Sequence, residues 1–160
     1  MLACLWLAAS AAIAGAWVPR DGEPLPDTAF RRTVAGFGGW LVVTPDPDWQ
    51  AKWDAPPRDV PRLPTAQYVD YGDRLTVLAF YTNPATDADG EIDIRCDVRV
   101  TRPDGSIASR AENRRCASPE PEGPLRALRL SWMVVEYVGE RTAPAGRWTV
   151  APESPFAPGV

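Results

Sequence analysis

The sequence predicts an all-β fold, an antiparallel β-sandwich with one short helix. Several short segments with strand-like patterns are separated by turn signals, which is typical of sandwiches. The chain has 18 prolines and 12 glycines among 160 residues, and a proline inside a helix costs about 3 kcal/mol, so a helical bundle is excluded. Hydrophobic residues make up 45% and charged residues 24%, as in ordinary globular proteins, so we expect one folded domain.

The amino-terminal segment predicts export. Residues 2–16 carry no charge, are rich in leucine and alanine, and are too short to span a bilayer, which needs about 20 residues. Ala12-Ile13-Ala14 and Ala14-Gly15-Ala16 both fit the small-x-small cleavage rule, so we expect a signal peptide cleaved after Ala14 or Ala16. An uncleaved anchor and a lipoprotein cysteine at Cys4 are the less favoured alternatives.

The chain then divides into four parts. We expect a signal peptide over 1–16, a loosely ordered lead-in over 17–38, the sandwich over 39–150 and an irregular, proline-rich tail over 151–160. The first strand is expected at 40–44. A short helix should follow at 46–53, because Asp46 can cap it and Pro47 suits its first position.

Three tryptophans are the first candidate binding residues. Trp49 and Trp53 are four residues apart, so they share one face of the helix. The favoured interpretation is that this face packs on the open side of a sheet, since paired aromatic residues are mostly buried. The alternative is an aromatic platform for a sugar ring or a peptide, formed with Trp40.

The remaining strands follow from hydrophobic periodicity. Residues 75–82 are apolar on both faces, which predicts a central strand. Residues 91–101 alternate without a break, so Ile92, Ile94, Cys96, Val98 and Val100 should share the buried face. A turn at 102–105 should return the chain as a strand over 106–112, with Cys96 opposite residue 111 or 112. Residues 125–137 alternate again, which places Leu128, Leu130, Trp132 and Val134 on one face, and 145–150 should open a last strand.

The cysteine count indicates a disulfide. Once the signal peptide is removed, Cys96 and Cys116 remain, and an even pair in an exported chain predicts a bridge worth about 3 kcal/mol. A reactive dithiol is the alternative, but Cys96 lies on an apolar strand face, where a thiolate is disfavoured.

Composition excludes several kinds of chemistry. The chain has no histidine, so it cannot form a Ser-His-Asp triad, a Cys-His pair or a zinc site built on imidazole. Its net charge is −4, from 17 basic and 21 acidic residues. Because the only basic pairs are Arg31-Arg32 and Arg114-Arg115, we expect no nucleic-acid partner.

An acidic segment is the weak metal candidate. The carboxylates of Asp87, Asp89, Glu91 and Asp93 stand at alternate positions around a glycine, like part of a calcium loop. Alignment on that glycine puts Ala85 and Cys96 at the first and last ligand positions, so we expect a polar turn, with no metal and no cofactor. The acid pairs Asp70 with Asp73 and Asp87 with Glu91 leave a carboxylate-dependent hydrolase as a further alternative.

Four segments together resemble a group of small, uncharacterised exported proteins of Gram-negative bacteria, over about residues 39–150. They are Thr44 to Trp53, Phe80 to Pro84, Cys96 to Asp104 and Gly146-Arg147-Trp148. The resemblance implies an immunoglobulin-like sandwich in the periplasm and brings no catalytic residues. Members of the group continue beyond the Gly-x-Trp strand, whereas residues 151–160 here contain three prolines, which cannot form a central strand. We therefore expect a truncation or frame shift near Val150 and a sandwich with an unpaired edge.

The function expected from the sequence is that of an exported, non-catalytic binding or structural module, periplasmic or secreted, without a cofactor. Its partner is an unknown protein or polymer, protein contact being favoured, and it meets a membrane only if the signal segment is uncleaved. A carbohydrate- or peptide-binding module that uses Trp40, Trp49 and Trp53, and a carboxylate-dependent hydrolase, are the alternatives.

Overall fold

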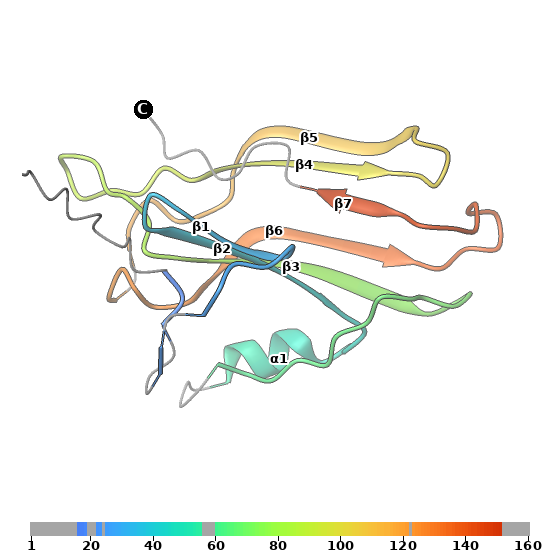
Figure 1. Ribbon diagram of the computed structural model, residues 1–160, viewed down its shortest axis with the longest axis horizontal. Helices are drawn as coiled ribbons and strands as arrows, with labels where there is room; N and C mark the ends of the chain where they lie inside the picture. Colours follow the sequence, from blue (N-terminus) through green and yellow to red (C-terminus); the bar gives the residue numbers. More distant parts are fainter. Residues whose placement is uncertain (1–15, 19–21, 24, 56–59, 122, 152–160) are drawn as a thin grey trace, which may run out of the picture.

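The protein folds as a sandwich of two antiparallel β-sheets, which confirms the predicted fold class (Figure 1). The computed structural model describes residues 16–18, 22–23, 25–55, 60–121 and 123–151. The four-stranded sheet has the order β1-β2-β3-β6, formed by Arg31–Val34, Phe37–Thr44, Arg74–Thr82 and Arg129–Val138. The three-stranded sheet has the order β5-β4-β7, formed by Ile107–Arg115, Arg95–Thr101 and Thr149–Ala151.

The short helix α1 (Trp49–Asp54) adds a third layer, on the far side of the four-stranded sheet from the three-stranded one (Figure 1). The central strand β3 therefore has a buried residue on both faces, as its apolar sequence predicts. Leu78 and Phe80 point toward α1, whereas Ala79 and Tyr81 point toward the other sheet. Within the described ranges, no helix combines the length and apolarity needed to cross a bilayer.

Two apolar clusters fill the spaces between the three layers. The inner cluster lies between the sheets and consists of Tyr81, Ile92, Ile94, Cys96, Cys116 and Ala117, with Phe37 and Met133 packed against it. The outer cluster lies between the four-stranded sheet and α1. It consists of Val42, Leu78 and Phe80, flanked by Trp40, Trp49, Trp53, Leu63, Leu128 and Leu130.

The strand order follows the immunoglobulin scheme. In that scheme strands A, B and E are neighbours in one sheet, and strands C and F are neighbours in the other. Here β2, β3 and β6 are neighbours, and β4 pairs with β7. Strand β5 pairs with the other side of β4, where variable-type domains place strand C′. The position of strand G, beside β7, holds no strand within the described part of the chain.

The predicted loosely ordered lead-in over 17–38 is wrong for much of its length. Residues 31–34 form β1, and β2 begins at Phe37, three residues before the expected start at Trp40. Trp17 is buried and contacts the Trp40 ring edge-on. This segment is rich in glycine and arginine and shows no regular alternation of apolar residues. The pairing of its strands therefore depends on the neighbouring strands and not on its own sequence pattern.

The predicted register of the β4–β5 hairpin is also wrong. Cys96 pairs with Arg114 rather than with residue 111 or 112. Two register shifts separate the turn from Cys96, and the second coincides with Asn113, whose φ is +52°. The Asn113 N–H donates a hydrogen bond to the Asp97 carboxylate across the hairpin. Each shift adds one residue to β5, so β5 ends at Arg115, next to Cys116.

The predicted common face of Leu128, Leu130, Trp132 and Val134 agrees with the register of β6. Leu130 pairs with Phe80 and Val134 with Leu78, and both partners point toward α1. The irregularity of the ladder between Leu78 and Phe80 adds two residues to β6, so the face does not change. Leu128 and Leu130 pack on the outer cluster, whereas Trp132 is 62% exposed and Val134 is also exposed. Periodicity therefore predicted the face but not how much of it is covered.

The predicted capping of the helix by Asp46, with Pro47 at its first position, is wrong, because α1 begins at Trp49 and its N-cap residue Asp48 forms no side-chain capping hydrogen bond. Asp46 instead holds the segment that leads into the helix. Its buried carboxylate accepts a hydrogen bond from the Asp48 N–H (3.0 Å) and another from the Lys52 ammonium, one turn into the helix. The hydrogen bond from Lys52 is the main reason why the pKa of Asp46 is lowered, and the Asp48 N–H adds to the effect against the opposing influence of burial. The ionised carboxylate thus ties α1 to the end of β2.

Replacement of Leu78 tests the assigned core of the outer cluster. Leu78 is fully buried, so we expect Leu78→Ala to lower the free energy of unfolding by about 2–5 kcal/mol, because it leaves a cavity. Ile107→Ala, at an exposed position of β5, should change it by less than about 1 kcal/mol. Urea denaturation measures both values, and similar losses for the two variants would contradict the assigned core.

Acid should weaken the attachment of α1 through Asp46. Because the folded-state pKa of this carboxyl lies below its usual value of 3.8, the group stabilises the fold above that pH. The contribution is lost as the pH falls from about 4 through the lowered folded-state pKa. Asp46→Asn should therefore lower the melting temperature at pH 7 and reduce its drop between pH 5 and pH 2.5, measured by circular dichroism. Asp54→Asn, an exposed change in α1, should leave the pH profile unaltered.

Candidate functional site

The three candidate tryptophans lie together over the outer face of the four-stranded sheet. Trp40 and Trp53 contact the Phe80 ring, with centroids 5.7 and 5.1 Å apart. Trp49 packs against the same cluster, and all three side chains are half-buried. Their contacts are those of a packed layer between helix and sheet, the favoured interpretation of the sequence. Ligand binding by this group stays a prediction.

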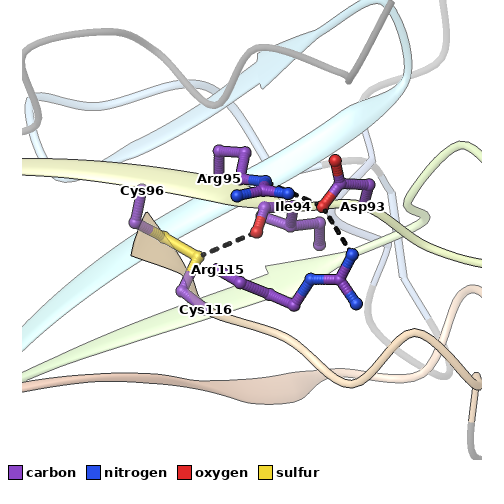
Figure 2. A network of polar contacts seen from close by, with 6 residues as sticks. All are labelled: Asp93, Ile94, Arg95, Cys96, Arg115 and Cys116. Carbon is purple, nitrogen blue, oxygen red and sulfur yellow. Dashed lines mark hydrogen bonds and ion pairs between the residues drawn. A yellow bond between two sulfur atoms is a disulfide. The ribbon is translucent and has the colours of Figure 1, made fainter. Parts of the chain in front are cut away.

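The acidic segment forms a closed turn. The Asp87 carboxylate accepts hydrogen bonds from the N–H groups of Asp89 (3.0 Å) and Glu91 (2.9 Å). Asp93, at the end of the segment, forms ion pairs with Arg95 (2.9 Å) and Arg115 (3.4 Å), drawn in Figure 2. The Asp87 carboxylate thus stabilises the turn, and the Asp93 carboxylate forms ion pairs with side chains of β4 and β5. Among the residues with described positions, no three acidic or cysteine side chains gather as a metal site would require.

The second acid pair also belongs to a turn. The Asp73 N–H donates to the Asp70 carbonyl (3.1 Å), and the Asp73 carbonyl accepts a hydrogen bond from the Gly139 N–H (2.9 Å). Gly139 is needed here because a Cβ at this position would lie 2.1 Å from the Asp70 carbonyl oxygen. The backbone of this pair fastens β3 to the end of β6. Hydrolytic activity of the two acid pairs stays a prediction.

The predicted bridge between Cys96 and Cys116 is present (Figure 2). The Cα atoms are 5.9 Å apart, within the usual range for a disulfide, and both residues are buried in the inner cluster. The Cys116 N–H donates to the Ile94 carbonyl (3.1 Å), which places the bridge at the end of the β4–β5 hairpin. Burial of both sulfurs supports the structural interpretation over the reactive dithiol.

The two outer edges of the three-stranded sheet differ in character. Strand β5 is exposed along most of its length and carries charged side chains at Arg110, Glu112, Arg114 and Arg115, which protect an edge from pairing. Strand β7 has only uncharged residues: Thr149, Val150 and Ala151. It pairs with β4 on one side, and none of the strands described here pairs with its other side. The free edge of β7 is thus the less protected one.

Two apolar side chains on the inner face of β2 are incompletely covered. Leu41 and Val43 of β2 pair with Ala79 and Val77, so all four point toward the three-stranded sheet. Ala79 and Val77 are buried, whereas Leu41 and Val43 are only half-buried. The difference fits a four-stranded sheet that extends beyond the three strands packed on it. We call Leu41, Val43 and β7 together the open edge.

The open edge was only partly predictable from the sequence. The prolines after Val150 led to the expectation of an unpaired edge near the end of the sandwich. Residues 152–160 lie outside the described residues, so that expectation stays a prediction. The participation of Leu41 and Val43 was missed, because a Leu-Val-Val run reads as apolar on both faces. The signal that could have indicated their partial exposure is the unequal number of strands in the two sheets.

Comparison of the chain with protein-family models, with curated proteins and with solved structures finds no match. The candidate site is therefore argued from the geometry of this chain alone.

Removal of the disulfide should destabilise the domain. Joint replacement Cys96→Ala and Cys116→Ala should lower the free energy of unfolding by about 3 kcal/mol, because the unfolded chain gains the freedom of the closed loop. Guanidinium denaturation of both proteins measures the difference. Reduction of the wild type with dithiothreitol should produce a similar loss. An unchanged denaturation midpoint in both experiments would contradict a structural role for the bridge.

Proposed function

We propose that this protein is an exported, non-catalytic immunoglobulin-like module, periplasmic or secreted, that works by contact with another protein. The observation that carries the proposal is the open edge, in which the sandwich combines an edge of β7 that no described strand pairs with and half-buried apolar side chains on the inner face of β2. A strand edge of this kind can bind an extended peptide segment through backbone hydrogen bonds, with alternate side chains entering the space beside it.

The geometry defines the chemistry of the partner. An extended segment beside β7 would extend the three-stranded sheet to four strands, and its inward side chains would cover Leu41 and Val43. Because side chains of a strand alternate between faces, the partner segment needs apolar residues at alternate positions. The charged edge of β5 does not suit the same role, so the contact is confined to one side of the sandwich.

Two further observations support the non-catalytic and exported parts of the proposal. The chain has no histidine, the commonest acid–base residue of catalytic sites. Backbone hydrogen bonds place the candidate acids in turns. The buried disulfide suits an oxidising compartment, in agreement with the small-x-small motifs that follow the apolar amino-terminal segment.

Photo-crosslinking at the open edge tests the proposal. We expect p-benzoylphenylalanine in place of Thr149, exposed on β7, to capture another polypeptide in cells of the native host. The same group in place of Ser109, exposed on β5, is the matched control and should capture little. Mass spectrometry of the adduct should identify a segment with apolar residues at alternate positions.

A side-chain variant makes the test specific. Leu41→Ala should weaken the adduct at position 149, because it removes half-covered apolar surface, while Ile107→Ala should leave it unchanged. Circular dichroism checks that both variants are folded. Adducts of equal yield at positions 149 and 109, adducts between two copies of this chain, or no adduct at all would each contradict the proposal.

A further inference from the structure

The inner face of β1 points toward the three-stranded sheet but is not covered by it. Arg32 is opposite Gly39, which is itself opposite Tyr81 of the inner cluster. Val34 is opposite Phe37, which packs on the same cluster. Residues opposite each other in an antiparallel pair share a face, so Arg32 and Val34 both lie on the inner face of β1. Both are nevertheless exposed, Val34 to 44%.

The stacking of the two sheets explains this exposure. Cys116, directly after β5, accepts a hydrogen bond from the Trp132 N–H of β6 (2.8 Å), so β5 lies near β6. Cys96 of β4 shares the inner cluster with Tyr81 of β3. In aligned sheets β7 then lies nearest β2, and β1 has no counterpart among the described strands. At the opposite edge of the sheet, Val135 on the inner face of β6 is half-buried.

Arg32 places a positive charge on this uncovered face. Its side chain is exposed, and none of the acidic side chains with described positions forms an ion pair with it. A charge of this kind can serve to keep other strands away from a sheet edge. The edge of β1 is already covered, however, because the indole N–H of Trp17 donates to the Arg32 carbonyl (3.3 Å) and the Ala16 N–H donates to the Thr33 hydroxyl (3.2 Å).

Arg32 also lies close to the open edge along the direction of the strands. Its pairing partner Gly39 is two residues from Leu41 on β2, a distance of about 7 Å in an extended strand. Leu41 and Val43 are themselves two residues apart on the same face. A segment that covers Leu41 and Val43 therefore reaches the level of Arg32 if it continues by two residues.

From this arrangement we infer that the protein segment bound at the open edge carries an inward-pointing aspartate or glutamate, which forms an ion pair with Arg32. The acid stands two positions from the inward apolar residue that covers Leu41. The inference rests on the proposed function, because it specifies the chemistry of the partner at the same edge.

The loss of hydration at Arg32 is the physical reason for an acid. A bound segment removes the guanidinium from water, which is unfavourable for a charge that gains no partner. An apolar or basic side chain at this position would leave the charge uncompensated, whereas a carboxylate can accept two parallel hydrogen bonds from a guanidinium. Arg32 thus discriminates against segments without the acid as well as attracting those that carry it.

Photo-crosslinking at position 149 identifies the partner segment and tests its dependence on Arg32. In cells of the native host, p-benzoylphenylalanine in place of Thr149 should capture a segment with an aspartate or glutamate two positions from an apolar residue. Arg32→Gln should lower the yield of this adduct about tenfold, because it removes one member of a covered ion pair. Arg114→Gln, the same change of charge at an exposed position of β5, is the matched control and should leave the yield unchanged.

A synthetic peptide with the sequence of the captured segment isolates the ion pair. Replacement of its acid by the corresponding amide should weaken binding to the wild-type protein about tenfold, measured by fluorescence anisotropy. The same replacement should have no effect on binding to Arg32→Gln, because the pair is already broken in that variant. Since Arg32 is exposed when nothing is bound, Arg32→Gln should keep the wild-type melting temperature.

The outcomes separate this inference from the proposed function. Equal affinities of the acid and amide peptides for the wild-type protein overturn the ion pair and leave the open edge as a binding site, and this result does not depend on the folding of any variant. A captured segment without an acid, or an amide effect that persists in full in Arg32→Gln, overturns the inference in the same way. The absence of any adduct at position 149 overturns the proposed function itself.

Discussion

The two sheets of this domain are joined at Cys116, where the chain leaves the three-stranded sheet and turns toward the four-stranded one. Its sulfur is bonded to Cys96 of β4 (Figure 2). Its backbone N–H donates to the Ile94 carbonyl. Its carbonyl accepts a hydrogen bond from the Trp132 N–H (2.8 Å) on β6. One residue thus connects both sheets through a covalent bond and two backbone hydrogen bonds. The inner cluster forms around this connection, because five of its six buried residues, all except Tyr81, lie on the segments that Cys96 and Cys116 join.

The opposite side of the four-stranded sheet depends on aromatic packing. Contacts run from Trp17 to Trp40, from Trp40 to Phe80 and from Phe80 to Trp53, so the amino-terminal segment, β2, β3 and α1 share one layer. Asp46 fixes the helix over this layer by an ionised, hydrogen-bonded carboxylate. Tryptophans that could have formed an exposed platform are instead partly covered by one another. The half-buried apolar side chains of the open edge, Leu41 and Val43, lie on the other face of the four-stranded sheet.

Periodicity predicted those parts of the fold in which local pattern and tertiary environment agree. Strand β3 is apolar on both faces because it lies between two packed layers, and Ile92, Ile94 and Cys96 are buried as their alternation requires. Pattern failed for the hairpin, where the two shifts in the β4–β5 ladder displaced the partner of Cys96. It also did not show that Trp132, on the same face of β6 as Leu130, is exposed. An inserted residue changes the face of every later side chain, and a sequence of alternating residues does not mark where the insertion falls.

By itself, the sequence determined the all-β class, the pairing of the cysteines, the presence of one short helix and the exclusion of histidine chemistry, because these follow from composition and local spacing. Only the tertiary structure decided that Ala16 and Trp17 belong to the domain, since both pack over Gly38 of β2 once β2 and β3 are paired. It also decided that Leu41 and Val43 are only half-buried. How far these side chains are covered depends on the unequal number of strands in the two sheets. The sequence of one strand does not show how many strands the opposite sheet has.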